Sequence, residues 1–411
     1  MNLRQAEEYL LDLELFGMRF GLDRMHRLMT ALGMPERRFA SIHVVGTNGK
    51  SSTVRMIAAI LERHGLRTGS YTSPHLVSFT ERVEIDERPV PGPAFAAAVA
   101  RAAHAAELVN RTQDEDDTVT QFEALTAAAY HELARREVEV AVVEAGLGGR
   151  YDATSVIPSK VQVLTNVGLE HTRWLGPTIA DIAEEKLAVV PDQGTLVTGE
   201  LHPDAEAVAE RVLEERHARL VRAPATVDQP LAAPGAFQRR NFALARAAAE
   251  AFLGELDGGA VSRAAAEVQV PGRMQTVARR PLTIFDGAHN PSGAQAVADA
   301  IPEVVGDRWL VGVLAVLDDK DAAGMLRALL PAFDQVVFTR TTNPRSLSPA
   351  TLESLASKLG GPPSETVASP RSALAHAQEL AGPAGAVLAA GSIYLVADLV
   401  RVDSAARASR L

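Results

Sequence analysis

The chain has 411 residues, of which 47% are hydrophobic and 22% are charged, a composition typical of a folded globular protein with about two or three domains. Its formal net charge of -10 argues against a large nucleic-acid-binding surface, because the 41 lysines and arginines are scattered rather than massed. The absence of cysteine excludes disulfides, thiolate metal sites and cysteine nucleophiles.

The chain begins with two predicted helices, residues 3–16 and 23–32, in which leucines recur at helical spacing. Acidic residues stand among the leucines of the first helix, so it lacks the basic and apolar pattern of a secretory leader. No apolar run in the sequence approaches the roughly 20 residues of a membrane-spanning helix. We therefore expect a cytoplasmic protein with no membrane partner and no nucleic-acid partner.

Residues 42–53 have the pattern of a strand, a turn and a helix that together bind phosphate, a motif we call the cradle. Gly46 and Gly49 allow a tight turn with inward N–H groups, and the Lys50 ammonium suits terminal phosphates. The spacing is shorter than in the general G-x-x-x-x-G-K-[ST] loop, because Val44 stands where that loop has its first glycine. An ordinary glycine-rich turn is the simpler alternative.

Strands and helices alternate after the cradle. The predicted strands and extended segments are residues 67–72, 82–86, 138–143, 161–166 and 195–198. The predicted helices are residues 93–109, 121–136, 178–190, 203–217 and 238–252. Residues 114–117 are all acidic and are predicted to form a solvated loop. The alternation predicts right-handed βαβ units and a doubly wound parallel sheet.

The regular pattern lapses between residues 272 and 281, and a new alternation of strands and helices then begins. We therefore predict an N-terminal domain over residues 1–278 and a C-terminal domain over residues 279–411. The strands predicted in the second domain are residues 282–285, 309–316, 335–339 and 386–389. The expected fold class is α/β, with a P-loop-type parallel-sheet domain followed by a smaller Rossmann-like domain, and with ligands in the cleft between them.

Several polar residues follow predicted strands, which is where open α/β sheets bind ligands. Glu144 ends an apolar strand and precedes a glycine-rich turn, so it is either a magnesium ligand or an ordinary strand-end carboxylate. His171 follows the next strand, but a lone histidine is more often structural than metal-binding. Lys186 lies among charged residues of a helical segment, where a solvated charge pair is the simpler interpretation.

The second domain contains a dense polar turn at residues 286–291, in which Pro291 fits the first position of a helix. Lys320 follows another predicted strand. Arg273 stands at the domain junction, where a guanidinium can hold a phosphate. Each feature on its own only suggests a ligand site.

As a set, these motifs resemble those of the folate branch of the Mur ligase family, the dihydrofolate synthase/folylpolyglutamate synthases. The matching segments span nearly the whole chain: residues 46–50, 72–76, 80–82, 144–150, 152–154, 170–172, 271–273, 286–291, 319–321 and 391–392. The resemblance implies an ATP-dependent amide-forming ligase. ATP would phosphorylate the carboxylate of a pterin or folate acid, and the amine of L-glutamate would attack the acyl phosphate to give dihydrofolate or folylpolyglutamate. Such phosphoryl transfer depends mainly on positioning of the reactants and on neutralisation of the phosphate charge, and the cradle can provide both.

The resemblance also implies roles for individual residues. ATP would be bound by Gly46, Thr47, Asn48, Gly49, Lys50, Ser51, Ser52, Asn241, Arg273 and Asp286. Two Mg²⁺ ions would be held by Ser73, Glu144 and His171, and a carbamylated Lys186 would join that metal site. The acid and glutamate substrates would be bound by Ser73, His75, Arg82, Thr120, Phe122, Asp152, Ala153 and Ser392, with the Phe122 ring stacking on a pterin. The catalytic residues would be Lys50, Lys186, His289 and Lys320.

The sequence departs from the family pattern at three places, with Ser51 in place of glycine, Ser155 in place of asparagine, and Leu187-Ala188 in place of Ala-Gly. The segment between residues 199 and 238 is also shorter than the family leads us to expect, so the choice of substrate stays open. One alternative is therefore a related ligase that joins an amino acid to a different small carboxylic acid.

Two further alternatives are weaker. A peptidoglycan-type Mur ligase carries a separate nucleotide-sugar-binding domain before the cradle, and the 45 residues that precede Gly46 are too few to form a typical α/β domain. A paralogue that binds nucleotide without catalysis would not need the joint presence of Lys50, Glu144, His171, Lys186 and His289. The family resemblance favours a monomer.

Overall fold

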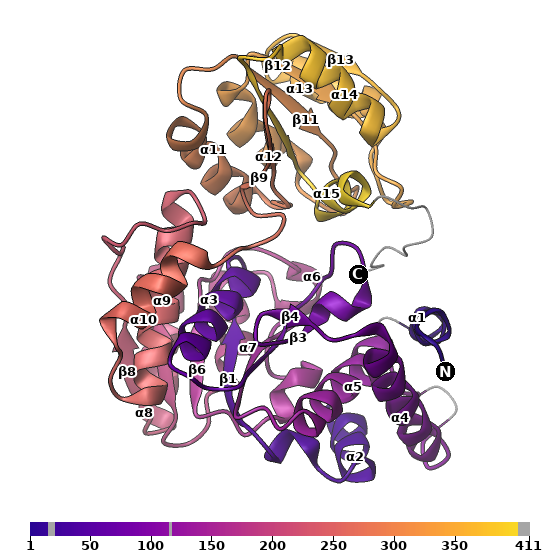
Figure 1. Ribbon diagram of the computed structural model, residues 1–411, viewed down its shortest axis with the longest axis vertical. Helices are drawn as coiled ribbons and strands as arrows, with labels where there is room; N and C mark the ends of the chain where they lie inside the picture. Colours follow the sequence, from indigo (N-terminus) through magenta and orange to yellow (C-terminus); the bar gives the residue numbers. More distant parts are fainter. Residues whose placement is uncertain (15–20, 115–116, 402–411) are drawn as a thin grey trace. The chain divides into compact units, whose positions relative to one another are not determined.

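The computed structural model describes residues 1–14, 21–114 and 117–401, which form two compact units. The first unit comprises the described residues of Met1–Pro230 together with Arg240–Val268, and the second comprises Leu231–Arg239 and the described residues from Gln269 onward. Each unit has its own sheet covered by helices (Figure 1). Among the described residues, no helix has both the length and the apolar character needed to cross a membrane.

The first unit is built on an eight-stranded sheet with the order β4-β3-β2-β5-β1-β6-β7-β8. Its strands are β1 (Ala40–Val45), β2 (Thr68–Tyr71), β3 (Val83–Ile85), β4 (Arg88–Pro89), β5 (Val140–Glu144), β6 (Val161–Leu164), β7 (Thr195–Thr198) and β8 (Arg219–Arg222). The strands from β2 to β8 in this order run parallel, while β3 pairs antiparallel with both of its neighbours, β2 and β4. Because β1 lies between β5 and β6, the loops that follow these three strands leave the sheet at one edge.

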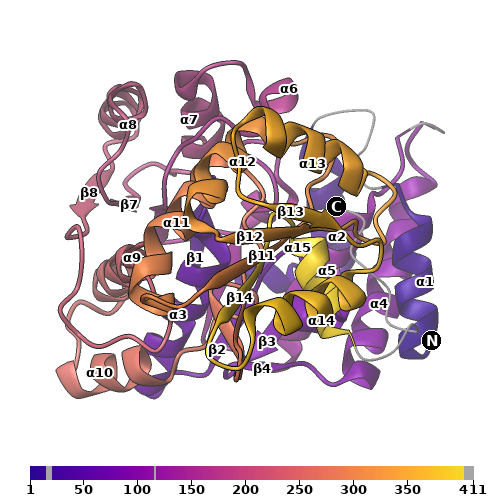
Figure 2. The same cartoon turned by 90° about the horizontal axis from the view of Figure 1, so that it is seen from above.

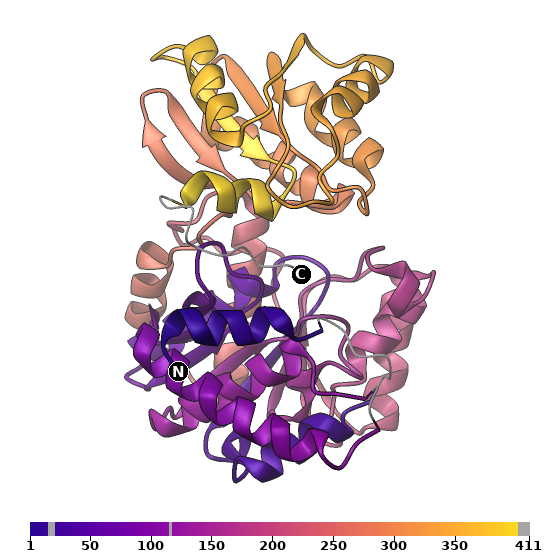
Figure 3. The ribbon, with the colours of Figure 1, turned by 90° about the vertical axis from the view of Figure 1, so that its right-hand side faces the viewer.

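Helices surround this sheet. They are α1 (Leu3–Asp12), α2 (Asp23–Ala31), α3 (Lys50–Arg63), α4 (Gly92–Asn110), α5 (Gln121–Arg135), α6 (Thr172–Leu175), α7 (Ile179–Leu187), α8 (Pro203–Glu215), α9 (Ala236–Leu253), whose first residues belong to the second unit, and α10 (Gly258–Glu267). Four short 3-10 turns are η1 (Pro35–Arg37), η2 (Phe79–Arg82), η3 (Ala153–Val156) and, in the second unit, η4 (Leu330–Ala332). One apolar core joins the sheet to α1, α2, α4 and α5, and α1 lies across α4 and α5 in Figure 3. A separate core joins β6 and β7 to α7 and α8.

The second unit is built on a six-stranded sheet with the order β13-β12-β11-β14-β10-β9. Its strands are β9 (Gln275–Arg279), β10 (Leu282–Phe285), β11 (Leu310–Leu314), β12 (Gln335–Phe338), β13 (Ser364–Thr366) and β14 (Ala386–Ala390). Its helices are α11 (Pro291–Val305), α12 (Ala322–Leu329), α13 (Pro349–Lys358), α14 (Pro370–Ala381) and α15 (Ile393–Val400). Only β9 runs antiparallel to its neighbour among the described strands of this sheet. Figure 2 shows α12 and α13 on one side of the sheet and α14 on the other.

The central strands follow the sequence prediction, with ends that move by no more than two residues. Four strands were not predicted, β4, β8, β9 and β13, and they are the four edge strands of the two sheets. Their side chains are mostly exposed or half-buried, so these segments lack the apolar runs by which buried strands are recognised. The predicted domain boundary at 278/279 falls inside β9, which pairs with β10 and belongs to the second unit.

Two further predictions in the first unit differ from the structure. The first helix ends at Asp12 rather than at residue 16, and residues 15 and 16 lie outside the described residues. The acidic segment 114–117 is only partly described, but its Asp117 is not solvated, because it pairs with Arg24, whose side chain is 7% exposed. Arg24 also binds Glu123 at 3.1 Å, and Glu123 closes the capping box of α5 with Thr120. This buried ion pair fixes the start of α5.

His43 is a buried histidine in β1, and its burial has a consequence for stability at low pH. Its side chain is enclosed, and burial lowers its pKa from 6.5 to about 4. Between these two pH values the unfolded chain binds a proton that the folded chain does not, so stability rises with pH through this window. We expect acidification across the window to cost the folded state about 3 kcal/mol through this residue.

This prediction is tested by urea unfolding of the wild-type protein and of His43→Gln between pH 4 and 6.5. Glutamine does not titrate, so the loss of stability on acidification should be smaller in the variant. Parallel pH profiles for the two proteins would show that His43 contributes nothing to acid unfolding.

Candidate functional site

The predicted cradle is the turn between β1 and α3. Gly46 has a φ of +147° and Gly49 a φ of +83°, values that favour glycine. A Cβ on Gly46 would lie 1.9 Å from Thr165 Oγ1, and one on Gly49 would lie 2.5 Å from Asn241 Oδ1. Gly49 is the N-cap of α3 and makes no side-chain cap. The positive end of α3 therefore faces the turn without a capping side chain, which suits an anion.

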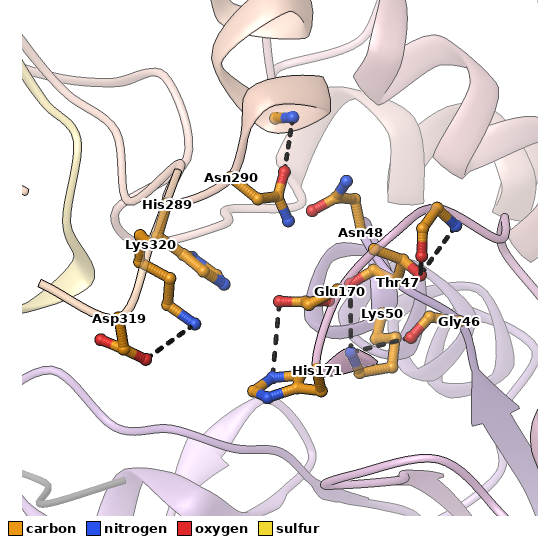
Figure 4. Close-up of polar contacts among 12 residues, drawn as sticks. Gly46, Thr47, Asn48, Lys50, Glu170, His171, His289, Asn290, Asp319 and Lys320 are labelled. Atoms are coloured by element: carbon orange, nitrogen blue, oxygen red, sulfur yellow. Dashed lines mark hydrogen bonds and ion pairs between the residues drawn. The ribbon is translucent and has the colours of Figure 1, made fainter. Parts of the chain in front are cut away.

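Two lysines meet at one backbone oxygen of the cradle. Lys50 Nζ donates to Gly46 O at 3.0 Å and to Thr47 O at 3.3 Å (Figure 4). Lys186 Nζ, from the last turn of α7, donates to the same Gly46 O at 2.8 Å. Lys186 is only 3% exposed, which excludes the interpretation of a solvated charge pair. Burial and, to a smaller extent, the charge of Lys50 lower the pKa of Lys186 to about 7.

A buried carboxylate lies beside the cradle. Glu144, the last residue of β5, accepts hydrogen bonds from Ser51 Oγ at 3.0 Å and from the backbone N–H of Ser73 at 3.1 Å. The carboxylate and hydroxyl oxygens gathered here belong to the ligand class that Mg²⁺ prefers, so the residues fit that ion.

His171 belongs to another loop, after β6, where its Nε2 lies 3.6 Å from Glu170 Oε1 (Figure 4). The part of the chain that the structure describes contains no group of three or more His, Asp or Glu side chains arranged to hold a metal. Among the described residues, Glu144 and His171 therefore do not complete a metal site by themselves. The metal role of Ser73, Glu144 and His171 stays a prediction.

The residues predicted to bind the acid substrate form two buried groups in the first unit. Arg82 Nε donates to His75 Nδ1 at 2.9 Å. The His75 ring packs against the Phe79 ring with a centroid distance of 4.4 Å. In the other group, the Phe122 ring stacks with Tyr71 at a centroid distance of 6.2 Å.

Phe122 also covers the turn that follows Glu144, because a Cβ on Gly146 would lie 2.6 Å from Phe122 Cζ. Asp152 accepts the Leu147 N–H of that turn at 2.7 Å and is the N-cap of η3, where Ala153 is buried. Thr120 is the N-cap of α5 and so sets the position of Phe122. The structure thus brings the Phe122 ring and Asp152 to the same turn.

In the second unit, the predicted polar turn follows β10. The Asp286 carboxylate accepts the N–H groups of Met274 at 2.8 Å and of Ala288 at 2.7 Å. Burial raises the pKa of Asp286, and the charge of Arg273 opposes this. His289 Nδ1 lies 3.0 Å from Gly287 O.

The other predicted residues of the second unit also follow strands of its sheet. Asn290 caps α11, in which Pro291 is the first residue, as predicted (Figure 4). Lys320 follows β11, and its Nζ lies 3.5 Å from Asp319 Oδ2. Ser392 follows β14 and is the N-cap of α15. Because β10, β11 and β14 are parallel neighbours, these side chains share one edge of the sheet.

Thr165 and Asn166 directly follow β6 and shape the cradle, and neither was predicted to be a site residue. Thr165 Oγ1 donates to Asn48 O at 2.6 Å, and Asn166 Oδ1 accepts the Asn48 N–H at 3.0 Å. Their position directly after an apolar strand was the available signal, the same one that pointed to Glu144.

Comparisons with known proteins identify the family. The Mur ligase middle domain matches residues 44–222, and the Mur ligase glutamate ligase domain matches residues 272–393. A dihydrofolate synthase/folylpolyglutamate synthase from Mycobacterium tuberculosis is 37% identical over 389 residues, which cover 83% of this chain and 78% of the relative. The chain belongs to the dihydrofolate synthase/folylpolyglutamate synthase family.

Solved structures of this family share the fold. The Mycobacterium tuberculosis folylpolyglutamate synthase complexed with ADP superposes with a TM-score of 0.91 at 34% identity, covering 96% of each chain. E. coli FolC in complex with DHPP and ADP has a TM-score of 0.86 at 30% identity and covers 97% of this chain and 96% of that chain. The predictions of the family and of the two-domain α/β fold class are confirmed, while the roles of single residues and the domain boundary stay predictions.

Proposed function

We propose that the chain is an ATP-dependent ligase that joins L-glutamate to the carboxylate of a pterin or folate acid through an acyl phosphate. The observation that carries the proposal is the cradle itself, where Lys50 and Lys186 meet at Gly46 O in a chain of this family. Products would be dihydrofolate from dihydropteroate, or a folate extended by one glutamate.

The cradle would bind the phosphates of ATP. The N-terminus of α3 and the Lys50 ammonium supply positive charge at a turn that requires glycine at positions 46 and 49, so the phosphates can approach the backbone closely. Asn241 lies against Gly49 and would complete this side of the nucleotide site. Two relatives of known structure are complexed with ADP, which supports nucleotide binding by this chain. Arg273 and Asp286 belong to the second unit, and their contacts to a nucleotide phosphate and sugar stay predictions.

Glu144, Ser73 and His171 would hold magnesium. When bound, Mg²⁺ would neutralise phosphate charge and so favour transfer of the phosphoryl group to the acid. Glu144 is already oriented for this by its bonds to Ser51 Oγ and Ser73 N.

Lys186 would act as a carbamate. The ammonium groups of Lys50 and Lys186 share the Gly46 carbonyl oxygen and repel each other. Because the pKa of Lys186 is about 7, a large fraction of Lys186 side chains is neutral near neutral pH. A neutral amine can attack CO₂, which forms one N–C bond and releases one proton. The resulting anion would lie beside Lys50 and replace repulsion by attraction.

Residues of the second unit would bind L-glutamate and accept a proton from its amine. The N–H at His289 Nδ1 donates to Gly287 O, so in the neutral ring Nε2 carries the lone pair that can accept a proton from the glutamate amine. Lys320 and Ser392 would bind carboxylate groups.

Release of ADP and phosphate should require ATP, Mg²⁺, L-glutamate and a pterin acid together, because the acyl phosphate forms only on the acid and is discharged by the amine. The experiment compares dihydropteroate and tetrahydrofolate, omits each component in turn and identifies the amide by mass spectrometry. A panel of small carboxylic acids serves as the control. If one of these acids supports turnover while every pterin fails, the chain is a ligase of a different acid.

A further inference from the structure

Three buried side chains form a continuous hydrogen-bond chain from β1, the strand before the cradle, to the turn after Glu144. His43 Nε2 lies 2.8 Å from Thr154 Oγ1, and the Thr154 hydroxyl donates to Asp152 Oδ1. The Thr154 backbone N–H donates to the same carboxylate oxygen at 3.0 Å, and the Leu147 N–H donates to Asp152 Oδ2 at 2.7 Å. His43, Thr154 and Asp152 are all enclosed by the protein.

The number of available protons decides which group donates and which accepts in each of these hydrogen bonds. A threonine hydroxyl has one proton, and here it goes to the carboxylate, which accepts. Thr154 Oγ1 must then accept from His43, so Nε2 carries the ring proton. Burial holds the pKa of His43 at about 4, and the ring is therefore neutral near neutral pH, with its single N–H directed at Thr154.

The Asp152 carboxylate depends on its donors. Burial raises its pKa, and the hydrogen bonds from Thr154, Leu147 and Gly146 act in the opposite direction. Loss of a donor therefore favours the protonated carboxyl and weakens its hold on the backbone of residues 146–152. His43 has no bond to Asp152 of its own but fixes the orientation of the hydroxyl that does.

The turn held in this way carries the surface proposed for the acid substrate. Gly146 packs under the Phe122 ring, and Asp152 and Ala153 lie at the end of the turn. A change in the orientation of Asp152 therefore reaches Phe122 through the backbone of Gly146 and Leu147.

We propose that His43 is a positioning residue, which orients the Asp152 carboxylate through Thr154 and so holds residues 146–152 in the shape that binds the acid substrate. The inference rests on the proposed function where it names that substrate as a pterin or folate acid.

Matched pairs of variants test the proposal. His43→Leu removes the N–H donor, while His43→Gln keeps one. Thr154→Val removes the hydroxyl at nearly constant shape, while Thr154→Ser keeps it. We expect the KM for dihydropteroate to rise about tenfold in the Leu and Val variants, with the KM for ATP changed less than about twofold, as for loss of one buried hydrogen bond. The Gln and Ser variants should recover most of the loss, which a purely packing role would not allow.

The double variant His43→Leu/Thr154→Val shows whether the two residues act through one chain. Its KM for dihydropteroate should be no higher than that of either single variant, because each substitution already breaks the same chain. Multiplicative effects of the two substitutions, or an equal rise in the KM for ATP, would overturn the proposal.

Amide hydrogen exchange gives a readout that does not depend on turnover. The N–H groups of Leu147 and Thr154 should exchange faster in His43→Leu and in Thr154→Val, and His43→Gln should restore their protection. Unchanged exchange in both of these variants would overturn the role of His43. Failure of the wild-type protein to use either dihydropteroate or tetrahydrofolate would instead overturn the proposed function, and the exchange rates would still decide whether His43 holds the turn.

Discussion

Replacing Lys186 by alanine should lower turnover by on the order of 100-fold, the scale found when a charged or hydrogen-bonding group is removed from a preorganised site. Lys186 is buried at the end of α7, with Nζ 2.8 Å from Gly46 O, and Lys50 donates to the same oxygen. Removal of the side chain takes away the group that would carry the carbamate. A short exogenous carboxylate such as acetate should restore part of the activity, because it can occupy the space and supply the charge.

Two variants test whether Lys186 acts as a carbamate or as a simple cation. Lys186→Arg keeps the positive charge but cannot form a carbamate, so it should be as inactive as Lys186→Ala. Lys160→Ala removes an exposed lysine of the same unit and should leave turnover unchanged.

Withdrawal of CO₂ tests the same modification in the wild-type protein. Removal of CO₂ and bicarbonate should lower turnover reversibly, and intact-mass spectrometry or ¹³CO₂ labelling should detect the adduct. Full activity of Lys186→Arg, or activity that is indifferent to CO₂, would exclude the carbamate.

The central strands of both sheets were predictable because they are buried on both faces. β5 and β11 read as nearly continuous apolar runs, which is typical of a parallel strand covered by helices on both faces. The edge strands β8 and β9 expose most of their side chains, and their pairing is decided by the neighbouring strand rather than by their own composition.

The residues of the candidate site likewise fall into those that the local sequence predicts and those that it does not. Gly46, Gly49 and Lys50 could be recognised from the sequence, because the backbone conformation and the charge needed for phosphate lie within one short turn. Lys186 lies 140 residues from Gly46, and the His43–Thr154 bond spans 111 residues. Contacts of this kind arise only when the sheet places distant loops side by side, so the family resemblance, and not local periodicity, pointed to Lys186.

Gly49→Ala should weaken nucleotide binding, and Gly65 offers a matched control. Both glycines flank α3 and have almost the same backbone angle, with φ of +83° at Gly49 and +85° at Gly65. Alanine at either position costs about 1–2 kcal/mol of backbone strain. Only at Gly49 does the new Cβ meet another group, since Asn241 Oδ1 would lie 2.5 Å away, whereas nothing lies within 4 Å at Gly65.

Calorimetric titration with ADP should show this difference directly. We expect Gly49→Ala to lose at least about tenfold in affinity, because relief of the overlap displaces either the cradle backbone or Asn241, at a cost of about 1–3 kcal/mol. Gly65→Ala should bind ADP as the wild type does and should only unfold at lower urea concentration. Because Asn241 is itself a proposed nucleotide contact, the double variant Gly49→Ala/Asn241→Ala is compared with Asn241→Ala. The Gly49→Ala substitution should cost less ADP affinity in that background than in the wild type, since the overlap is then absent. An equal loss of ADP affinity in Gly65→Ala would mean that a general weakening of α3, rather than the contact at Gly49, governs nucleotide binding.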